Sequence, residues 1–529
     1  MALAAAIALA GWPRSEARAA DAEPPTEPSL SGRTADIAAY DVVGASLLST
    51  TEIELALEPF LGPGRPIEDV EKARAAVEKL YQDKGYQAVT VSIPQQTVRN
   101  GEVRLRVNEA RVGRLRIRGS RWFSLSEIRR QAPSVEEGKV LNFNDLMRDV
   151  VALNQLPDRR VAPVLRAGAI PGTVDVDLNV QDNFPLHGSL ELNNRYSTGT
   201  VHARLAGSLH YDNLWQIGHS LSFSFQVAPK RLDDAKVFSA SYLARLPGIS
   251  WLSLLANGVV QDSDVSTVGG ILVSGRGRIL GGRAMFTLPG TSRFFQSIST
   301  GLDYKRFQEK MTLGDGTISE TPITYWPVTV QYAGTVQGES SLTQFGASVI
   351  FNLRSLSSDS QQFDDKRVKA SGNFGFYRAD LSRTEELPLG FQAQAKVQGQ
   401  YSRDPLLSSE QFTAGGAETV RGYQEGEAVG DYGAAASFEA RSPSLAPGGQ
   451  TVLTDLRLVG FAEGAWLAIH EATVEQKPSF QLASAGGGVR IKLFDSLSGA
   501  FDVGVPLRTN GTMTQRLKPR LHFRVWGEF

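Results

Sequence analysis

The sequence predicts a transmembrane antiparallel β-barrel of about 16 strands, preceded by two small α+β domains. Three observations predict this fold. Alternating polar and apolar residues dominate from residue 184 to residue 529, two mixed α and β patterns precede them, and the chain opens on a short apolar run. The chain has 529 residues, no cysteine and a formal net charge of -1. These values exclude disulfides and thiolate metal sites, and they provide no basic field that would favour nucleic acid.

Residues 1–19 are predicted to be a secretory signal peptide. Residues 2–12 form the apolar run, and Ala17-Arg18-Ala19 fits a small-x-small cleavage site, although no Lys or Arg precedes the run. A disordered Ala-rich tail is the alternative. Residues 20–38 are predicted to be a short Pro-rich acidic linker. No later stretch of about 18 apolar residues occurs, so we expect a periplasmic protein, a secreted protein or an outer-membrane barrel.

Residues 39–110 are predicted to form the first α+β domain. A helix is expected after Pro66, which fits a first-turn position, and before Gly85, which fits a C-terminal cap. Its apolar residues recur at helical spacing, at Ile67, Val70, Ala73, Val77 and Leu80. Strands are expected over residues 86–93 and around the alternating residues 103–107.

Residues 111–183 are predicted to repeat this pattern as a second α+β domain. A strand over 111–120 is followed by a short helix over 125–133, which Pro133 ends, and by a second helix within 141–158. The second helix carries Leu146, Val150 and Leu153 on one face. Two strands over 161–168 and 172–182 complete the domain. Each domain has about 70 residues, which is within the usual size of independent domains.

Residues 184–529 are predicted to form the barrel. The stretch that begins at His219 shows the pattern, because Leu221, Phe223 and Phe225 share one face and Ser222 and Ser224 the other. A soluble β-sandwich or propeller would also alternate, but its strands are usually shorter and its polar faces more charged. Strands of about 9–11 residues cross a bilayer when tilted, and every backbone group in lipid must be paired, so the sheet must close.

The last ten residues, 520–529, alternate through Leu521, Phe523 and Val525 and end on Phe529. Phe523, Val525 and Phe529 resemble the C-terminal recognition signal of bacterial outer-membrane proteins. An amphipathic final strand that happens to end in Phe is the alternative.

Three stretches carry a further resemblance, namely residues 153–180, residues 412–443 with the motif Val-Arg-Gly-Tyr, and residues 456–467. Together they resemble the two-partner secretion transporters (TpsB), the haemolysin secretion/activation type of the ShlB/FhaC/HecB family. These belong to an outer-membrane assembly-factor superfamily whose periplasmic modules are called POTRA domains. The resemblance covers nearly the whole mature chain and implies that 39–110 and 111–183 are POTRA domains.

The resemblance implies a function. The protein would be an outer-membrane pore whose POTRA domains, in the periplasm, recognise one large unfolded exoprotein of β-helical (TpsA-like) type and export it. Strand addition to POTRA sheet edges near Tyr86–Ile93 and Val161–Leu165 would bind that chain. No cofactor, no metal and no enzymatic activity are expected. The expected partners besides the exoprotein are outer-membrane lipid and the barrel assembly machinery, and a monomer is expected.

The resemblance also implies a site. The loop with Val420, Arg421, Gly422 and Tyr423 would fold into the barrel lumen, and Arg421 would pair with an acidic residue of the wall. The matching wall strand contains Phe461 and Glu463, and its alternation places Arg457, Val459, Phe461 and Glu463 on one inward face. This chain has Glu where the family pattern has Asp, and its glycine, Gly464, comes one residue early, so Glu439 could compete for Arg421. Alternatively, Arg421 serves only to stiffen the loop.

Other functions fit the sequence less well. Many family members have an N-terminal helix that plugs the pore, and no amphipathic helix precedes Tyr40, so either this member has no plug or its N-terminus is missing. An insertase of the same superfamily is the main alternative, an outer-membrane enzyme a second and a diffusion porin a third. The six His residues, at 187, 202, 210, 219, 470 and 522, form no spaced metal pair on a helix, and no Gly-x-Ser-x-Gly element occurs.

Overall fold

The computed structural model describes residues 34–529 except 99, 247, 269–270, 313–317, 448–450, 473–475 and 510–513. It divides into two compact units, with the division between Phe184 and Pro185. The predicted signal peptide, 1–19, lies outside the described residues, as does the predicted linker up to residue 33. Among the helices in the described ranges, none is long and apolar enough to cross a membrane.

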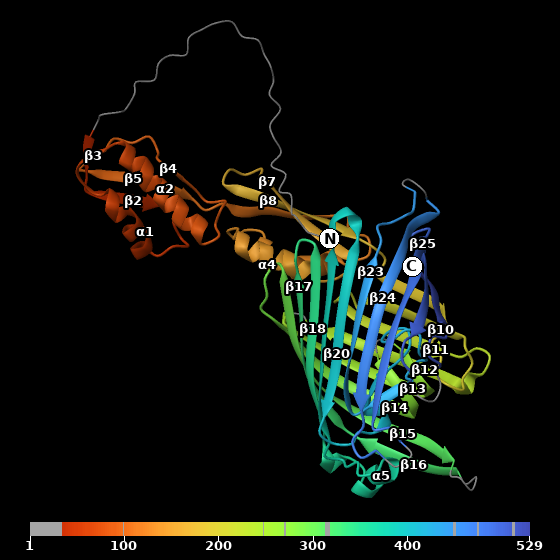
Figure 1. Ribbon diagram of the computed structural model, residues 1–529. Coiled ribbons are helices and arrows are strands. Elements are labelled where there is room, and N and C mark those ends of the chain that lie inside the picture. The colour runs from red at the N-terminus through yellow and green to blue at the C-terminus, as the bar shows by residue number, and fades with distance from the viewer. Residues whose placement is uncertain are drawn as a thin grey trace. The chain divides into compact units, whose positions relative to one another are not determined.

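The first α+β domain is a three-stranded sheet covered by two helices (Figure 1). In the sheet, β2 (Ala39–Val43) lies parallel to β5 (Glu102–Asn108), and β4 (Thr90–Ser92) pairs antiparallel with the other edge of β5. The predicted helix is α2 (Glu68–Asp83), which buries Ala73, Val77 and Tyr81. Gly85 follows it with φ +92°, a left-handed conformation that glycine adopts without strain.

Three features of this domain differ from the sequence prediction. Strand β1 (Thr34–Ile37) lies within the predicted linker 20–38 and pairs with β3 (Gly62–Pro66), so ordered structure begins before residue 39. The predicted strand over 86–93 is only the three residues of β4, because a turn, in which the Tyr86 N–H bonds the Tyr81 carbonyl, uses the residues before it. Helix α1 (Thr50–Leu57) was not predicted, and a 3-10 turn over Glu58–Phe60 follows it.

The second domain repeats the topology of the first. Its sheet has the order β6-β8-β7, in which β6 (Arg111–Arg118) is parallel to β8 (Thr173–Asp182) and β7 (Arg159–Ala167) is antiparallel to it. The same order, with the third strand between the first two, occurs in β2-β5-β4. Helices α3 (Leu125–Arg130) and α4 (Phe143–Leu153) pack Ile128, Leu146, Val150 and Leu153 into one core. The repeat expected from the sequence is therefore present in the structure.

The second unit is a closed antiparallel barrel (Figure 1). Seventeen described segments form it, but β16 and β17 both pair with β15 and are separated only by Trp326, so they act as one strand. The predicted fold, with about 16 strands, is thereby confirmed. The strands are β9 (Leu186–Asn193), β10 (Arg204–Leu214), β11 (His219–Val227), β12 (Ala235–Arg245), β13 (Leu252–Val268), β14 (Ile271–Leu288), β15 (Phe294–Thr312), β16 (Ile318–Tyr325), β17 (Pro327–Gln337), β18 (Ser341–Asn352), β19 (Gly375–Glu386), β20 (Gln392–Ser402), β23 (Tyr432–Arg441), β24 (Leu453–Ala468), β25 (Ser479–Leu493), β26 (Leu497–Pro506) and β27 (Arg520–Glu528).

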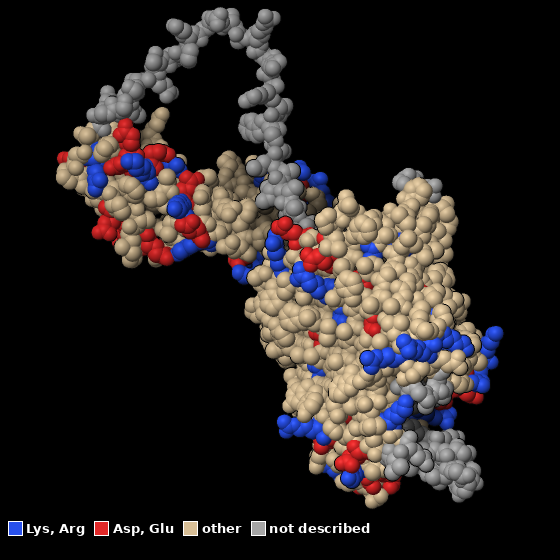
Figure 2. All heavy atoms as spheres, viewed as in Figure 1, with Lys and Arg blue, Asp and Glu red and all other residues tan. Residues whose placement is uncertain are grey.

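The barrel is apolar on its outside and polar on its inside, the reverse of a soluble β-sheet protein. On β11, Leu221 and Phe223 are each 47% exposed, whereas Ser220 and Gln226 on the opposite face are 6% and 4% exposed. Figure 2 shows that the visible barrel wall consists mostly of uncharged residues. Apolar side chains on the outer face of a closed sheet belong in lipid, so this pattern identifies a membrane barrel.

The barrel closes where its last strand pairs with its first. Five residue pairs join β27 to β9, from Arg524 with Asn193 to Glu528 with Ser189. Phe529 extends this pairing, because its N–H and C=O bond the Gly188 backbone at 3.1 and 3.2 Å. A Cβ on Gly188 would lie 2.5 Å from the Phe529 ring, so the ring covers this glycine. A role for the C-terminal residues as a recognition signal stays a prediction.

Candidate functional site inside the barrel

The candidate site is the Val-Arg-Gly-Tyr segment, which lies between β20 and β23. A small hairpin, β21 (Phe412–Ala414) with β22 (Ala428–Gly430), forms the base of the segment. The wall residues that Arg421 and Gly422 contact include Glu439, Glu463 and His522, all on the inner face of the barrel. Their chain neighbours Phe438 and Leu521 are each 53% exposed on the outer face. The segment therefore folds into the lumen, as the sequence resemblance implied.

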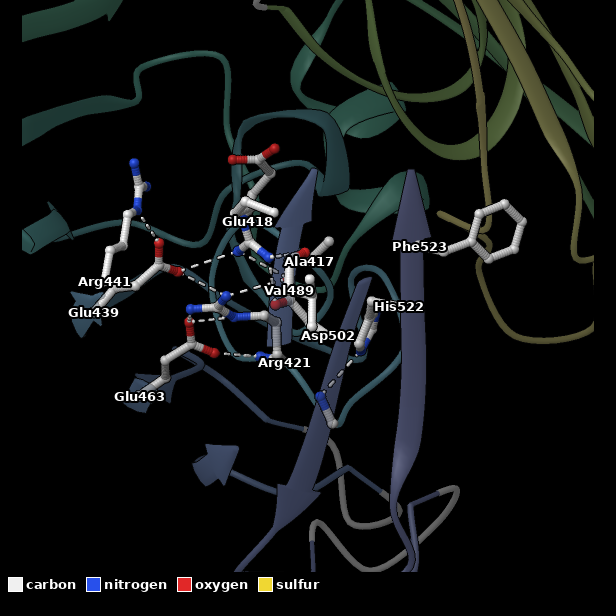
Figure 3. A network of polar contacts seen from close by, with 12 residues as sticks. Ala417, Glu418, Arg421, Glu439, Arg441, Glu463, Val489, Asp502, His522 and Phe523 are labelled. Atoms are coloured by element: carbon white, nitrogen blue, oxygen red, sulfur yellow. Dashed lines mark hydrogen bonds and ion pairs between the residues drawn. The ribbon is translucent and has the colours of Figure 1, made fainter. Parts of the chain in front are cut away.

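Arg421 binds Glu463 through both its side chain and its backbone (Figure 3). Its Nε donates to Glu463 Oε1 at 2.8 Å, and its Nη2 lies 2.6 Å from the same oxygen. The Arg421 backbone N–H donates to Glu463 Oε2 at 2.5 Å. Arg421 is 5% exposed and Glu463 8% exposed. A carboxylate that holds both the guanidinium and the main chain fixes the position of the loop as well as the charge.

Glu439, the possible competitor, binds Arg421 at the same time as Glu463 does. Arg421 Nη1 donates to Glu439 Oε2 at 2.8 Å and lies 3.3 Å from Asp502 Oδ2. Two more arginines complete the network, because Arg490 pairs with Asp502 at 2.7 Å and Arg441 with Glu439 at 2.7 Å. Three guanidinium groups thus face three carboxylates, and their formal charges cancel. This balance is what allows so many charged groups to be buried together.

Phe461 lies beneath the guanidinium. The Arg421 Cζ is 3.5 Å from the centroid of the Phe461 ring, which is a close cation–π contact. Phe461 and Glu463 are two residues apart on β24, so both point inward and meet Arg421 from the same strand. The wall strand predicted to receive Arg421 therefore contacts it with both of the predicted side chains.

Gly422 lets the loop lie directly on the barrel wall. It has φ +99°, and a Cβ built on it would be 3.2 Å from the backbone of Gly504 and of Pro506. A Cβ on Gly504 would in turn be 2.5 Å from the Gly422 nitrogen. The Gly422 N–H donates to His522 Nε2 at 3.1 Å. Two facing glycines thus allow backbone to approach backbone at β26.

Tyr423 and Val420 anchor the segment on either side of Arg421 and Gly422. The Tyr423 hydroxyl donates to the carbonyls of Arg508, at 2.8 Å, and Ala483, at 3.1 Å, while its ring is buried. Val420 is also fully buried, in an apolar cluster with Tyr423, Ala414, Ala428, Ala435, Ala465, Leu467 and Leu482. All four residues of the predicted motif therefore contact the loop itself or the inner wall.

A second buried clamp, missed by the sequence reasoning, holds the end of the loop. Asp431 is 0% exposed, and its carboxylate accepts from Arg367 Nη1 at 2.7 Å and from Arg367 Nη2 at 2.5 Å. It also accepts from Gln411 Nε2 at 3.1 Å and from the backbone N–H groups of Leu406, at 2.9 Å, and His470, at 2.7 Å. Arg367 directly follows α5 (Ser360–Lys366), so this clamp connects three separate loops. Its partners lie far apart in the sequence and leave no local motif.

In the first α+β domain, the buried carboxylate of Glu109 binds backbone N–H groups. Glu109 accepts from the N–H groups of Ser46, at 2.7 Å, and Leu47, at 3.0 Å, and from the Tyr81 hydroxyl at 2.9 Å. Burial raises the pKa of Glu109, but these hydrogen bonds outweigh it and the pKa is lowered overall. Burial lowers the pKa of Arg159 to about 10. No arrangement of these groups resembles a nucleophile with its base.

Among the described residues, one group of His and carboxylate side chains could hold a metal ion, namely His187, His210 and Asp212. The sequence predicted no metal site, because none of its His residues forms a spaced metal pair on a helix. These three residues are brought together by the pairing of β9 with β10, which is visible only once the strand register is known.

Comparisons with known proteins agree with this architecture. A family model described as haemolysin secretion/activation protein ShlB/FhaC/HecB matches residues 172–491, more than half of the chain. A model of the POTRA domain, ShlB-type, matches residues 35–110. The heme/hemopexin transporter protein HuxB of Haemophilus influenzae is 22% identical over 476 residues, which cover 87% of this chain and 81% of that protein. The outer membrane transporter CdiB of Escherichia coli is 24% identical over 522 residues, which cover 92% and 81%.

Solved structures show the same fold. CdiB from Escherichia coli matches with a TM-score of 0.68 at 19% sequence identity, over 96% of this chain and 92% of that one. BamA from Haemophilus ducreyi lacking POTRA domains 1–3 matches with a TM-score of 0.55 at 13% identity, over 94% of this chain and 100% of that one.

Proposed function

This chain belongs to the haemolysin secretion/activation family ShlB/FhaC/HecB, and from that premise we propose how its parts carry an exoprotein through the outer membrane. The protein is an outer-membrane transporter of the two-partner secretion type, with its POTRA domains in the periplasm. The cargo we propose is one large, unfolded chain of the β-helical type, and the protein has no enzymatic activity of its own. The insertase alternative is not favoured.

The observation that carries the proposal is the Arg421 loop in the lumen. It meets inner-wall residues on β23, β24, β26 and β27 through a network of three arginines and three carboxylates. We propose that this network holds the loop in a defined resting position, from which it must shift when a polypeptide enters. The charges are paired within the protein, so a passing chain meets few unpaired groups that would bind it tightly.

The POTRA edge that we propose receives the exoprotein is β7. Of the two candidate edges, β4 has three residues and β7 has nine. The odd-numbered residues of β7 direct their backbone groups away from β8. At Val161 both outward-facing backbone groups are already bonded by the Asn154 side chain. The Val161 N–H donates to Asn154 Oδ1 at 2.6 Å, and Asn154 Nδ2 donates to the Val161 carbonyl at 3.0 Å. Pro163 has no N–H. The open part of the edge is therefore Leu165 and Ala167, which overlaps the predicted Val161–Leu165 only at Leu165 and extends two residues beyond it.

A proline substitution tests this edge without breaking the sheet. The Ala167 N–H points away from β8, whereas the neighbouring Gly168 N–H bonds the Thr173 carbonyl at 2.9 Å. We expect Ala167→Pro to reduce secretion of the partner at least tenfold while barrel insertion is unchanged, because it removes only an outward-facing donor. Ala167→Ser, which keeps the N–H, is the control. Equal secretion by the two variants would reject β7 as the receiving edge.

The transport proposal itself is tested by secretion. The protein is produced together with its candidate exoprotein, and the amount of exoprotein in the medium is compared with that from cells lacking the transporter. Export that depends on the transporter supports the proposal. If export is unchanged and outer-membrane proteins as a class are depleted, the insertase alternative replaces it.

A further inference from the structure

A cluster of imidazole and carboxylate groups lies on the inner wall where the barrel begins. His187 on β9 is the direct cross-strand partner of His210 on β10, and their ring centroids are 5.0 Å apart. Asp212 is two residues beyond His210 and therefore on the same face of β10. The neighbouring residues Leu190 and Leu209 are 57% and 46% exposed on the lipid face, so the cluster points into the lumen.

The strands beneath this cluster hold its side chains in register. The ladder between β9 and β10 continues to the start of the barrel, where the Asp212 N–H donates to the Pro185 carbonyl at 2.9 Å. Since Pro185 directly follows the POTRA region in the chain, this rim of the barrel faces the periplasm. A site built on paired strands is more rigid than one on a loop, which favours metal binding because less side-chain and backbone order has to be gained.

The distances suit a small transition-metal ion. One ligand atom from each of the three residues lies within 4.8 Å of the others, and His210 Nε2 is 3.4 Å from Asp212 Oδ2. Zinc bonds to His nitrogen and carboxylate oxygen are about 2.1 Å long, so two ligand atoms of a tetrahedral zinc site are about 3.4 Å apart. His210 and Asp212 therefore already stand at the required separation. The His187 ligand atom lies within 4.8 Å of both of them.

The nearby Arg245 guanidinium makes its hydrogen bonds outside the cluster. Arg245, whose charge interacts with Asp212, donates from Nη1 to the Gly218 carbonyl, at 2.5 Å, and to the Ser220 hydroxyl, at 3.0 Å. Its hydrogen bonds are thus made to β11 and the turn before it. The Asp212 carboxylate remains directed at His210, where an ion would bind.

From this geometry we propose that His187, His210 and Asp212 bind one Zn²⁺ ion on the inner wall at the periplasmic rim. Two imidazoles and one carboxylate favour zinc over magnesium or calcium, which prefer sites made only of oxygen ligands. Three protein ligands leave one tetrahedral position for water or for a group of the passing chain. A bound ion would also link β9, whose other neighbour is the closing strand β27, to β10.

The test is titration of the purified full-length protein in detergent with ZnCl₂, followed by calorimetry. We expect one saturable site with micromolar or tighter affinity. His210→Asn and Asp212→Asn should each weaken binding at least tenfold, because even the loss of a supporting hydrogen bond costs about 10- to 100-fold. The matched control is His219→Asn, since His219 lies at the start of β11 and is hydrogen-bonded to Tyr242 at 2.6 Å. This control should bind as the unmodified protein does.

Two further readouts make the result decisive. Heat-modifiable migration in electrophoresis establishes that each variant is a folded barrel. Electron paramagnetic resonance of bound Cu²⁺ should reveal two nitrogen ligands in the unmodified protein and one in His187→Asn. Absence of saturable binding, equal weakening by His219→Asn, or an unchanged nitrogen count in folded His187→Asn would each overturn the site and leave adventitious binding only. None of these readouts depends on transport.

Discussion

Replacing Arg421 by alanine should release the lumen loop while the barrel remains intact. The substitution leaves three buried carboxylates facing two arginines, Arg441 and Arg490. Removing one partner of a buried ion pair costs about 3–5 kcal/mol. Each 1.4 kcal/mol is a factor of ten, so the ratio of docked to undocked loop should fall by roughly 100- to 4,000-fold. Arg421→Lys keeps the charge but loses the planar fork, so its effect should be smaller.

Hydrogen exchange of the loop measures this change directly. In the unmodified protein, amides of residues 418–427 should exchange slowly, because the Arg421 and Gly422 N–H groups donate to Glu463 and His522. In Arg421→Ala they should exchange at least about 100-fold faster, whereas amides of β12 and β18 should be unaffected. Unchanged protection of 418–427 in a folded Arg421→Ala barrel would refute the argument that the buried network holds the loop.

Three other predictions follow from the same contacts. Gly422→Ala should speed hydrogen exchange of the loop, because a side chain at φ +99° costs about 1–2 kcal/mol and its Cβ would lie 3.2 Å from the backbone of β26. The control Gly460→Ala, which has open space around its Cβ, should leave exchange unchanged. Equal effects of the two variants would contradict the close-approach argument. Asp431→Asn should destabilise the folded barrel by about 3–5 kcal/mol in urea unfolding, because it leaves the Arg367 guanidinium without its charged partner; a change below 1 kcal/mol would contradict the role of the clamp. In the second POTRA domain, burial raises the pKa of Asp182, but hydrogen bonds from the backbone of residues 121–123 outweigh burial and lower this pKa overall. The ionised Asp182 carboxylate therefore stabilises the fold above the pKa that it has in the unfolded chain. This stabilisation is lost as the pH falls through the lower pKa of the folded state. The melting temperature of Asp182→Asn should therefore lie below that of the unmodified protein at pH 7, and the difference should shrink as the pH falls below the unfolded-state pKa, whereas a constant difference would contradict the pKa direction.

Much of the fold follows from the alternation of polar and apolar residues along the sequence. The inward position of Glu463 could be derived because Leu458 on the other face of its strand is suited to lipid and is 53% exposed in the structure. Helix α1 was overlooked, yet its start has a readable signal, a capping box in which Ser49 and Glu52 bond each other's backbone N–H groups. That motif predicts a helix that starts after Ser49.

Other contacts between distant segments could not be read from the sequence. Asp431 meets Arg367 across 64 residues, and neither has a characteristic neighbour sequence. His187 and His210 meet only because β9 and β10 pair in one register, and a shift of one residue would place His210 on the lipid face. That Arg421 would bind Glu439 as well as Glu463 also depends on the positions of two neighbouring strands, β23 and β24. These are tertiary facts, determined by strand register and loop packing.

The most direct test of the account compares export by the unmodified protein with export by Arg421→Ala and Gly460→Ala. All three should reach the outer membrane in equal amounts and show heat-modifiable migration. We predict that the exoprotein reaches the medium with the unmodified protein and with Gly460→Ala, and at least tenfold less with Arg421→Ala, because that change undocks the loop. Full export by an inserted Arg421→Ala barrel would contradict the claim that the buried arginine network serves transport.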